Sequence, residues 1–168
     1  MAPPPGPSPQ AGTVCPTSAG SCTNPGLYKV PLSIPSTVDG TNGGSATITS
    51  TKTCQQIFHT DFGNPCGAPT EVWAYNGEFP GPTILAQKGV PFDITHVNNL
   101  GNDWDNNPID ITVHHHGLHI GPAFDGHPQP DAVTDSSFGV DAAGLISPGS
   151  SFTYETTNNQ EPGTHWYQ

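Results

Sequence analysis

Three consecutive histidines give this sequence its clearest capacity for chemistry. They lie in the segment ITVHHHGLH, residues 111–119. Successive side chains of an extended strand point to opposite faces, so we expect His114 and His116 to share one face and His115 to point to the other. A rise of about 3.3 Å per residue separates the two imidazoles of the pair by roughly 6–7 Å. That separation allows chelation of one metal ion or of two adjacent ions, and imidazole suits copper, zinc, nickel and iron alike.

The other five histidines carry weaker signals. His165 belongs to the segment GTHWYQ and receives no role from the sequence. The remaining four, each taken alone, are predicted to be solvated side chains rather than metal ligands: His59, His96, His119 and His127. The sequence also lacks a G-x-S-x-G segment that would position a nucleophilic serine, and it lacks a glycine-rich phosphate loop. Metal binding is therefore the chemistry that the residue pattern favours.

Short strands separated by turns are expected to hold these histidines in place. Of the 168 residues, 20 are Gly and 20 are Pro, which leaves little room for long helices. Alternating or β-branched stretches bounded by turn residues predict strands within these ranges: 27–34, 45–51, 71–77, 78–89, 90–100, 109–120, 151–157 and from 163 onward. Strands at roughly 8–12-residue spacing are typical of an all-β sandwich or barrel, which is the fold class we expect.

The charge balance excludes several classes of partner. The chain has 14 Asp and Glu residues against three Lys and no Arg, which gives a formal net charge of −11 at pH 7. A nucleic-acid partner or an anionic membrane surface would require a basic face, so neither is expected. No stretch approaches the ~20 apolar residues that span a bilayer. Metal ions and other cations would be attracted to such a surface.

Four cysteines indicate disulfides and an oxidising compartment: Cys15, Cys22, Cys54 and Cys66. Three pairings are possible, of which Cys15–Cys22 with Cys54–Cys66 is the most local. Residues 1–26 are rich in Pro, Gly and Ser and are predicted to be a tail or irregular loop, pinned by the first of these disulfides. This beginning has no basic region followed by an apolar one, so it is not an intact signal peptide. We expect a secreted, periplasmic or extracellular protein.

Six motifs follow one another in a fixed order: NGEFPGPTI (76–84), VNNL (97–100), HHHGLH (114–119), FDG (124–126), SPGSSFTYE (147–155) and GTHWYQ (163–168). Together they resemble the N-terminal cupredoxin domain of laccase-like multicopper oxidases. The resemblance covers residues 71–168. It implies a Greek-key β-sandwich, with residues 27–168 forming a single cupredoxin-like domain.

The resemblance also implies roles for particular residues. The first copper motif of the family, His-x-His-Gly, falls on residues 114–117. His114 would therefore bind the type 2 copper and His116 one of the type 3 coppers. His115 occupies the variable position, which is often Trp, and would not be a ligand. Asp125 matches an acidic residue near the trinuclear copper centre that helps proton delivery, acting from outside the ligand set.

The chain departs from the family pattern in two places. The second copper motif, His-Ser-His, follows Gly-Thr-x-Trp-Tyr, but here Gln168 stands where its first His is expected, and His165 takes the variable position. A type 1 copper site needs a Cys and two His, commonly with an axial Met. All four cysteines precede residue 67, and the single Met is Met1. We therefore expect a domain that is truncated at its C-terminal end and inactive alone.

The leading hypothesis is the copper-binding first domain of a laccase-like enzyme, which removes single electrons from its substrate and reduces O2 to water. Its partners would be the remaining cupredoxin domains of the same enzyme or of another subunit, with a small-molecule reductant and O2. The alternative is a stand-alone copper- or zinc-binding β-sandwich in which His114, His116 and His165 hold one ion. A third interpretation is a structural sandwich with incidental histidines.

Overall fold

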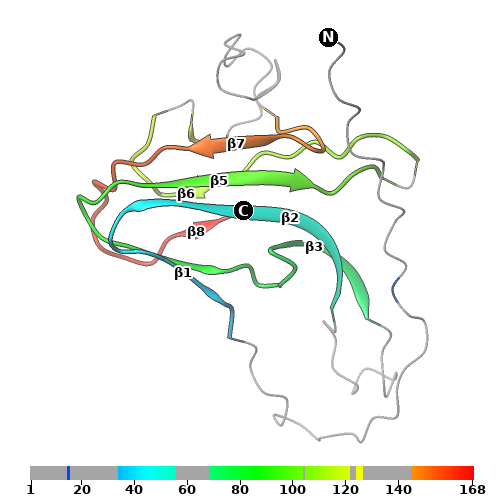
Figure 1. Ribbon diagram of the computed structural model, residues 1–168, viewed down its shortest axis with the longest axis horizontal. Coiled ribbons are helices and arrows are strands. Elements are labelled where there is room, and N and C mark those ends of the chain that lie inside the picture. Colours follow the sequence, from blue (N-terminus) through cyan, green and yellow to red (C-terminus); the bar gives the residue numbers. More distant parts are fainter. Residues whose placement is uncertain (1–14, 16–33, 56–68, 104, 122–123, 127–144) are drawn as a thin grey trace, which may run out of the picture.

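The computed structural model describes residues 15, 34–55, 69–103, 105–121, 124–126 and 145–168. These residues form β-strands and no α-helix (Figure 1). The strands are β1 (Thr37–Gly40), β2 (Gly44–Gln55), β3 (Thr70–Tyr75), β4 (Thr83–Ala86), β5 (Phe92–Asn99), β6 (His115–His116), β7 (Ser151–Tyr154) and β8 (Trp166–Tyr167). The all-β prediction is confirmed. Among the described residues, no helix is long and apolar enough to cross a membrane.

The strands form one large sheet and two small ones. The large sheet has the order β3-β2-β5-β7, in which β2 pairs with β3 antiparallel and with β5 parallel, and β5 pairs with β7 antiparallel. Figure 1 shows these strands side by side. Strand β1 pairs with β4 parallel, and β6 pairs with β8 antiparallel. Both small sheets contribute side chains to the apolar clusters that cover one face of the large sheet.

Alternation along the strands builds this buried face. In β5 every second side chain is buried, beginning at Phe92, as a half-buried strand requires. One cluster consists of Val113, Ile146, Phe152 and Tyr154, and the other consists of Ile48, Phe92 and Ile94. Tyr75 and Tyr167 pack against both clusters and so join them.

The turn after β3 confirms a sequence signal. Asn76 and Gly77 both have positive φ angles, 53° and 76°, as the two central residues of a type I′ turn require. Tyr75 and Glu78 form an isolated bridge on either side of them. The predicted strand in 71–77 is thus confirmed as β3 followed by a tight turn.

The strand predicted within 109–120 is much shorter than expected: it consists of His115–His116, preceded by an isolated bridge between Ile111 and Ile146. Just before them, the N–H of Val113 donates to the Tyr154 hydroxyl at 3.0 Å instead of joining a backbone ladder. Just after them, Gly117 takes a positive φ of 78°, which ends the extended conformation. Of the strand predicted within 27–34, only Ile34 is described, and it lies outside any strand.

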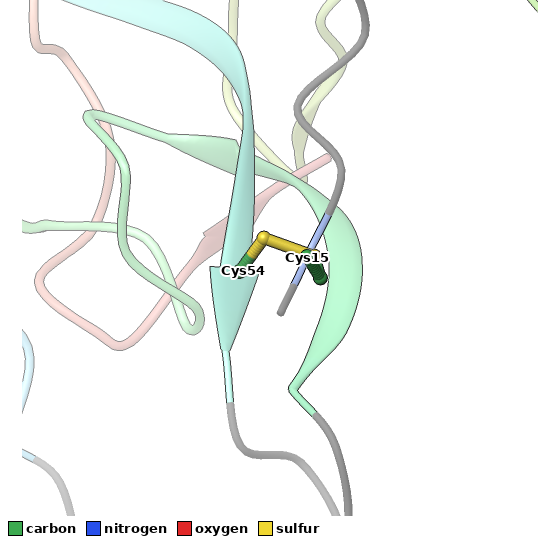
Figure 2. Close-up of a disulfide and its surroundings, with 2 residues drawn as sticks. All are labelled: Cys15 and Cys54. Atoms are coloured by element: carbon green, nitrogen blue, oxygen red, sulfur yellow. A yellow bond between two sulfur atoms is a disulfide. The ribbon is translucent and has the colours of Figure 1, made fainter. Parts of the chain in front are cut away.

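The disulfide differs from the most local pairing. Cys15 is bonded to Cys54, with a Cα–Cα distance of 5.6 Å (Figure 2). The expected pairs Cys15–Cys22 and Cys54–Cys66 are therefore wrong, and residues 22 and 66 lie outside the described part of the chain. Loop-closure entropy rises only slowly with loop length, so a separation of 39 residues costs little more than a short one.

Asn98 holds the large sheet to the segments that lead into the histidines. Its buried Nδ2 group donates to the carbonyl oxygens of Ile109 and Ile146, each at 2.7 Å, and its Oδ1 accepts from the N–H of Leu100 at 3.0 Å. We expect Asn98→Ala to lower the free energy of unfolding by about 3 kcal/mol, because it removes three buried hydrogen bonds. The carbonyl of Ile109 and the N–H of Leu100 lose their side-chain partner, whereas the carbonyl of Ile146 keeps its bond from the N–H of Ile111. Urea unfolding measures this change. Asn99→Ala, at the exposed neighbouring position, should change stability by less than about 0.5 kcal/mol.

Candidate metal centre

Strand β8 holds the three histidines in an extended conformation. His115 pairs with Tyr167 and His116 pairs with Trp166 in antiparallel register. The N–H of His114 donates to the carbonyl of Gln168 at 2.9 Å, and the N–H of Gln168 donates back to the carbonyl of His114 at 3.0 Å. The backbone of the histidine segment is therefore fixed on one side by consecutive paired residues.

The side chains alternate as expected. His115 is only 3% exposed and points into the interior, where its ring lies 5.0 Å from the ring of Tyr154. The His114 side chain is 35% exposed, and His116 is exposed. Their ring centroids lie 5.7 Å apart with planes inclined by 69°. Two imidazoles thus converge on the outer face of β6, while the third faces the core.

Neighbouring groups restrict both outer rings. The Trp166 ring meets the His116 ring edge-to-face at a centroid distance of 5.1 Å. Nδ1 of His114 lies 2.6 Å from the backbone carbonyl oxygen of Asp125, and 3.3 Å from its carboxylate Oδ1. A carbonyl oxygen only accepts hydrogen bonds, so this contact favours the tautomer of the neutral ring that has its proton on Nδ1 and its lone pair on Nε2. A metal-binding histidine is normally oriented by such a bond from its other nitrogen.

This donor set fits copper in part. Imidazole nitrogens suit copper, and the rings of His114 and His116 supply two imidazoles at close range. No three His, Cys, Asp or Glu side chains lie close enough to hold a metal ion within the described residues. A metal site built on His114 and His116 would therefore need further ligands.

The other predicted residues lie outside this pair. His119 is exposed, and its backbone N–H donates to Oε1 of Gln160 at 2.7 Å. His165 is also exposed, and its ring lies beside Gly117 rather than beside the pair. The geometry thus gives no support to His165 as a third ligand. His59 and His127 fall outside the described residues.

His96 is a buried residue that the sequence prediction missed. It was expected to be solvated, but it lies in β5 and is fully buried, 5.5 Å from the ring of His115. Neither ring nitrogen of either residue has a hydrogen-bond partner within the described part of the chain. Burial lowers the pKa of His96 to about 3 and that of His115 to about 4, so both rings are neutral at pH 7. The alternation that starts at Phe92 places residue 96 on the buried face and could have revealed this.

A large apolar hollow adjoins the histidine segment. Its volume is about 960 Å³, and its walls include His115 and Tyr167. Four exposed large apolar side chains also line it: Trp73, Phe79, Leu85 and Trp166. Exposed apolar side chains that gather around a hollow are typical of surfaces that contact a protein partner or a ligand.

Solved structures identify the fold class. The chain superimposes on the crystal structure of a laccase from Pediococcus acidilactici with a TM-score of 0.61 and 23% sequence identity, over 94% of this chain and 28% of that one. The predicted cupredoxin-like Greek-key β-sandwich is confirmed by this likeness. The fold is that of a cupredoxin-like domain.

Sequence comparisons identify the family. The family model described as multicopper oxidase matches residues 57–168. Laccase-21 of Oryza sativa subsp. japonica is 37% identical over 113 residues, which cover 66% of this chain and 16% of that protein. Laccase-1 of Cryptococcus neoformans var. neoformans is 37% identical over 108 residues, which cover 63% of this chain and 14% of that protein. The chain belongs to the multicopper oxidase family, and it spans about one sixth of the length of these relatives.

Proposed function

We propose that this chain is the copper-binding first domain of a laccase-like multicopper oxidase, which couples one-electron oxidation of a small-molecule reductant to reduction of O2 to water. The observation that carries this proposal is the convergence of His114 and His116, with the Nε2 atom of His114 left free by the bond at Nδ1. Family membership supports copper as the metal. Localisation in a secreted or periplasmic compartment follows from the same proposal and agrees with the Cys15–Cys54 disulfide.

In this proposal His114 binds a type 2 copper and His116 binds a type 3 copper. Bound copper ions would supply one-electron redox chemistry and the reduction of O2. The residues of this chain hold and orient the ligands: the paired strands β6 and β8 fix the backbone, and Trp166 restricts the His116 ring. Restricting the rings before the metal arrives reduces the entropy that binding must overcome.

Asp125 is proposed to transfer protons between solvent and the copper site. Its side chain is 40% exposed, and its Oδ1 lies 3.3 Å from Nδ1 of His114. The carboxylate therefore contacts both solvent and the outer side of the proposed ligand. A proton held at Oδ1 can pass between water and the vicinity of the metal without Asp125 entering the ligand set.

The missing ligands are proposed to come from other cupredoxin domains of the same enzyme or of another subunit. Residues 27–168 would act as a single domain whose apolar hollow is covered in the complete protein. Trp73, Phe79 and Trp166 are each more than half exposed around that hollow. Trp166 also packs on His116, so the hollow and the half-site adjoin each other.

Oxygen consumption tests the proposal that this chain supplies only part of the copper site. The isolated chain, mixed with Cu(II) and a phenolic reductant, is expected to show no steady oxygen uptake above that of a His114→Ala, His116→Ala variant mixed with the same amount of copper and reductant. Two imidazoles are too few ligands to assemble the complete site, and no third His, Cys, Asp or Glu joins them among the described residues. Steady uptake that depends on His114 and His116 would show that the chain is an oxidase by itself and would overturn the proposal of a partial site.

Cu(II) titration followed by electron paramagnetic resonance tests the ligand assignment. The expected spectrum shows superhyperfine coupling to imidazole nitrogen, and this coupling is expected to disappear in the His114→Ala, His116→Ala variant. Coupling that persists in the double variant would contradict the assignment. The same titration with zinc as competitor examines the stand-alone alternative, because a zinc site that binds more tightly than copper would contradict a copper domain.

A further inference from the structure

We propose that Gly126 is a positioning residue, which holds the carbonyl of Asp125 against His114 and so fixes that ring as a metal ligand. The inference rests on the proposed role of His114, and it adds a residue to which no function is assigned. The segment involved is residues 124–126, which lies against the backbone at Val113 and His114.

The evidence is the lack of room beside Gly126. A Cβ atom at this position would lie 2.0 Å from the carbonyl oxygen of Val113, 2.4 Å from its carbonyl carbon and 2.8 Å from the N atom of His114. All three are backbone atoms, which cannot rotate away as the end of a side chain can. Gly126 has the closest such approach among the described glycines. A side chain here would push the turn away from the histidine segment.

Glycine also satisfies the backbone conformation. The φ angle of Gly126 is +69°, in the left-handed region that residues with a Cβ rarely adopt. Gly101 has nearly the same φ angle, +71°, but no atom lies within 4 Å of its Cβ position. The two glycines therefore share the conformational requirement and differ in close contact. This difference provides a matched control.

The close approach has a chemical consequence at His114. It brings the Asp125 carbonyl to 2.6 Å from Nδ1, which keeps the proton on Nδ1 and the lone pair on Nε2. The His114 side chain is 35% exposed, so water would otherwise compete for Nδ1 and release the ring. A displaced turn would allow the second tautomer and other ring orientations. Loss of such an orienting bond typically lowers metal affinity 10–100-fold.

The first test reads the tautomer of His114 in the metal-free chain. Two-bond 1H–15N correlation spectra at about pH 8, above the ordinary histidine pKa, distinguish a proton on Nδ1 from one on Nε2. The wild-type chain and Gly101→Ala are expected to show Nδ1–H, whereas Gly126→Ala is expected to show a mixture or Nε2–H. An unchanged Nδ1–H signal in a folded Gly126→Ala variant would overturn the inference.

The second test measures copper affinity in the same variants. Gly126→Ala is expected to bind Cu(II) about 10–100-fold more weakly than wild type, and Gly101→Ala less than about threefold more weakly. Equal losses in both variants would show that backbone strain alone is responsible and would overturn the inference. If wild type shows no binding that depends on His114, the proposed function fails, while the tautomer readout still decides the positioning role.

Asp125→Ala covers the case in which Gly126→Ala does not fold. This variant removes the carboxylate but keeps the backbone carbonyl beside His114. We expect the Nδ1–H tautomer to persist, because the carbonyl held by Gly126 is the acceptor. A switch to Nε2–H would show that the carboxylate orients the ring, and the inference would then be wrong.

Discussion

Replacing His114 and His116 together with alanine is expected to lower the affinity for Cu(II) by more than about 100-fold, to the level of nonspecific binding to the acidic surface. Each substitution removes one of two imidazoles whose rings lie 5.7 Å apart, so the double variant has neither of the proposed ligands. Isothermal titration calorimetry or competition with a chromophoric chelator measures this loss. The single variants should each retain weak binding through the remaining ring.

His119→Ala is the matched control for this experiment. His119 lies three residues after His116, is exposed and has a side chain outside the pair. Its removal should leave Cu(II) affinity within about threefold of wild type, as expected for a surface residue away from the ligands. Equal losses on removal of His119 or of His165 would show that copper binds elsewhere and would refute the assignment of the half-site.

The second large effect concerns pH. Metal-free chain is expected to lose stability as pH falls from 6.5 toward 4, because His96 and His115 are buried as neutral rings. Their pKa values are about 3 and about 4 in the folded chain, against 6.5 for an ordinary histidine. Below pH 6.5 the unfolded chain therefore binds up to two more protons than the folded one. Linkage then gives a slope of up to about 2.7 kcal/mol per pH unit.

The sign and the pH window distinguish this effect from ordinary acid unfolding. The stabilisation is fully present above pH 6.5 and is lost as pH falls toward the folded pKa values. Three described carboxyl groups also have lowered pKa values, through hydrogen bonds to their anionic forms: Asp39, Glu78 and Asp103. Their ordinary pKa values are 3.8 to 4.5, so their contribution to the loss falls mainly below about pH 4.5. Urea unfolding between these limits, with a chelator present, isolates the histidines.

Phenylalanine variants assign the effect to the pair. His96→Phe and His115→Phe should each remove about half of the slope, and the double variant should remove nearly all of it. At neutral pH His96→Phe is also expected to raise the free energy of unfolding by about 1–2 kcal/mol, because it removes buried nitrogens without partners. An unchanged slope in the double variant would show that other groups control acid stability.

Local residue patterns predicted much of this fold. Alternation predicted β5 and the face that His115 takes, and the Asn76–Gly77 pair predicted the turn after β3. These features depend on neighbouring residues along the chain, which a strand periodicity or a turn conformation makes visible. The paired outward rings of His114 and His116 follow from the same rule.

Contacts between distant segments could not be predicted in this way. The N–H of Val113 donates to the hydroxyl of Tyr154, 41 residues away, and is therefore not paired within the strand predicted at 109–120. Cys54 bonds to Cys15 rather than to a nearer cysteine. The orienting bond at His114 comes from a backbone carbonyl, and every residue type carries one. Side-chain identity therefore gives no sign of it.

The Cys15–Cys54 disulfide has a consequence for cleavage of the chain. Two of the three lysines, Lys29 and Lys52, lie between the bonded cysteines, and the chain has no arginine. A trypsin cut at either position severs the backbone but leaves both fragments covalently joined through sulfur. Under oxidising conditions a nicked molecule therefore keeps its N-terminal segment and its apparent mass. Only reduction separates the pieces, so the disulfide keeps the two fragments in one molecule after a first proteolytic cut.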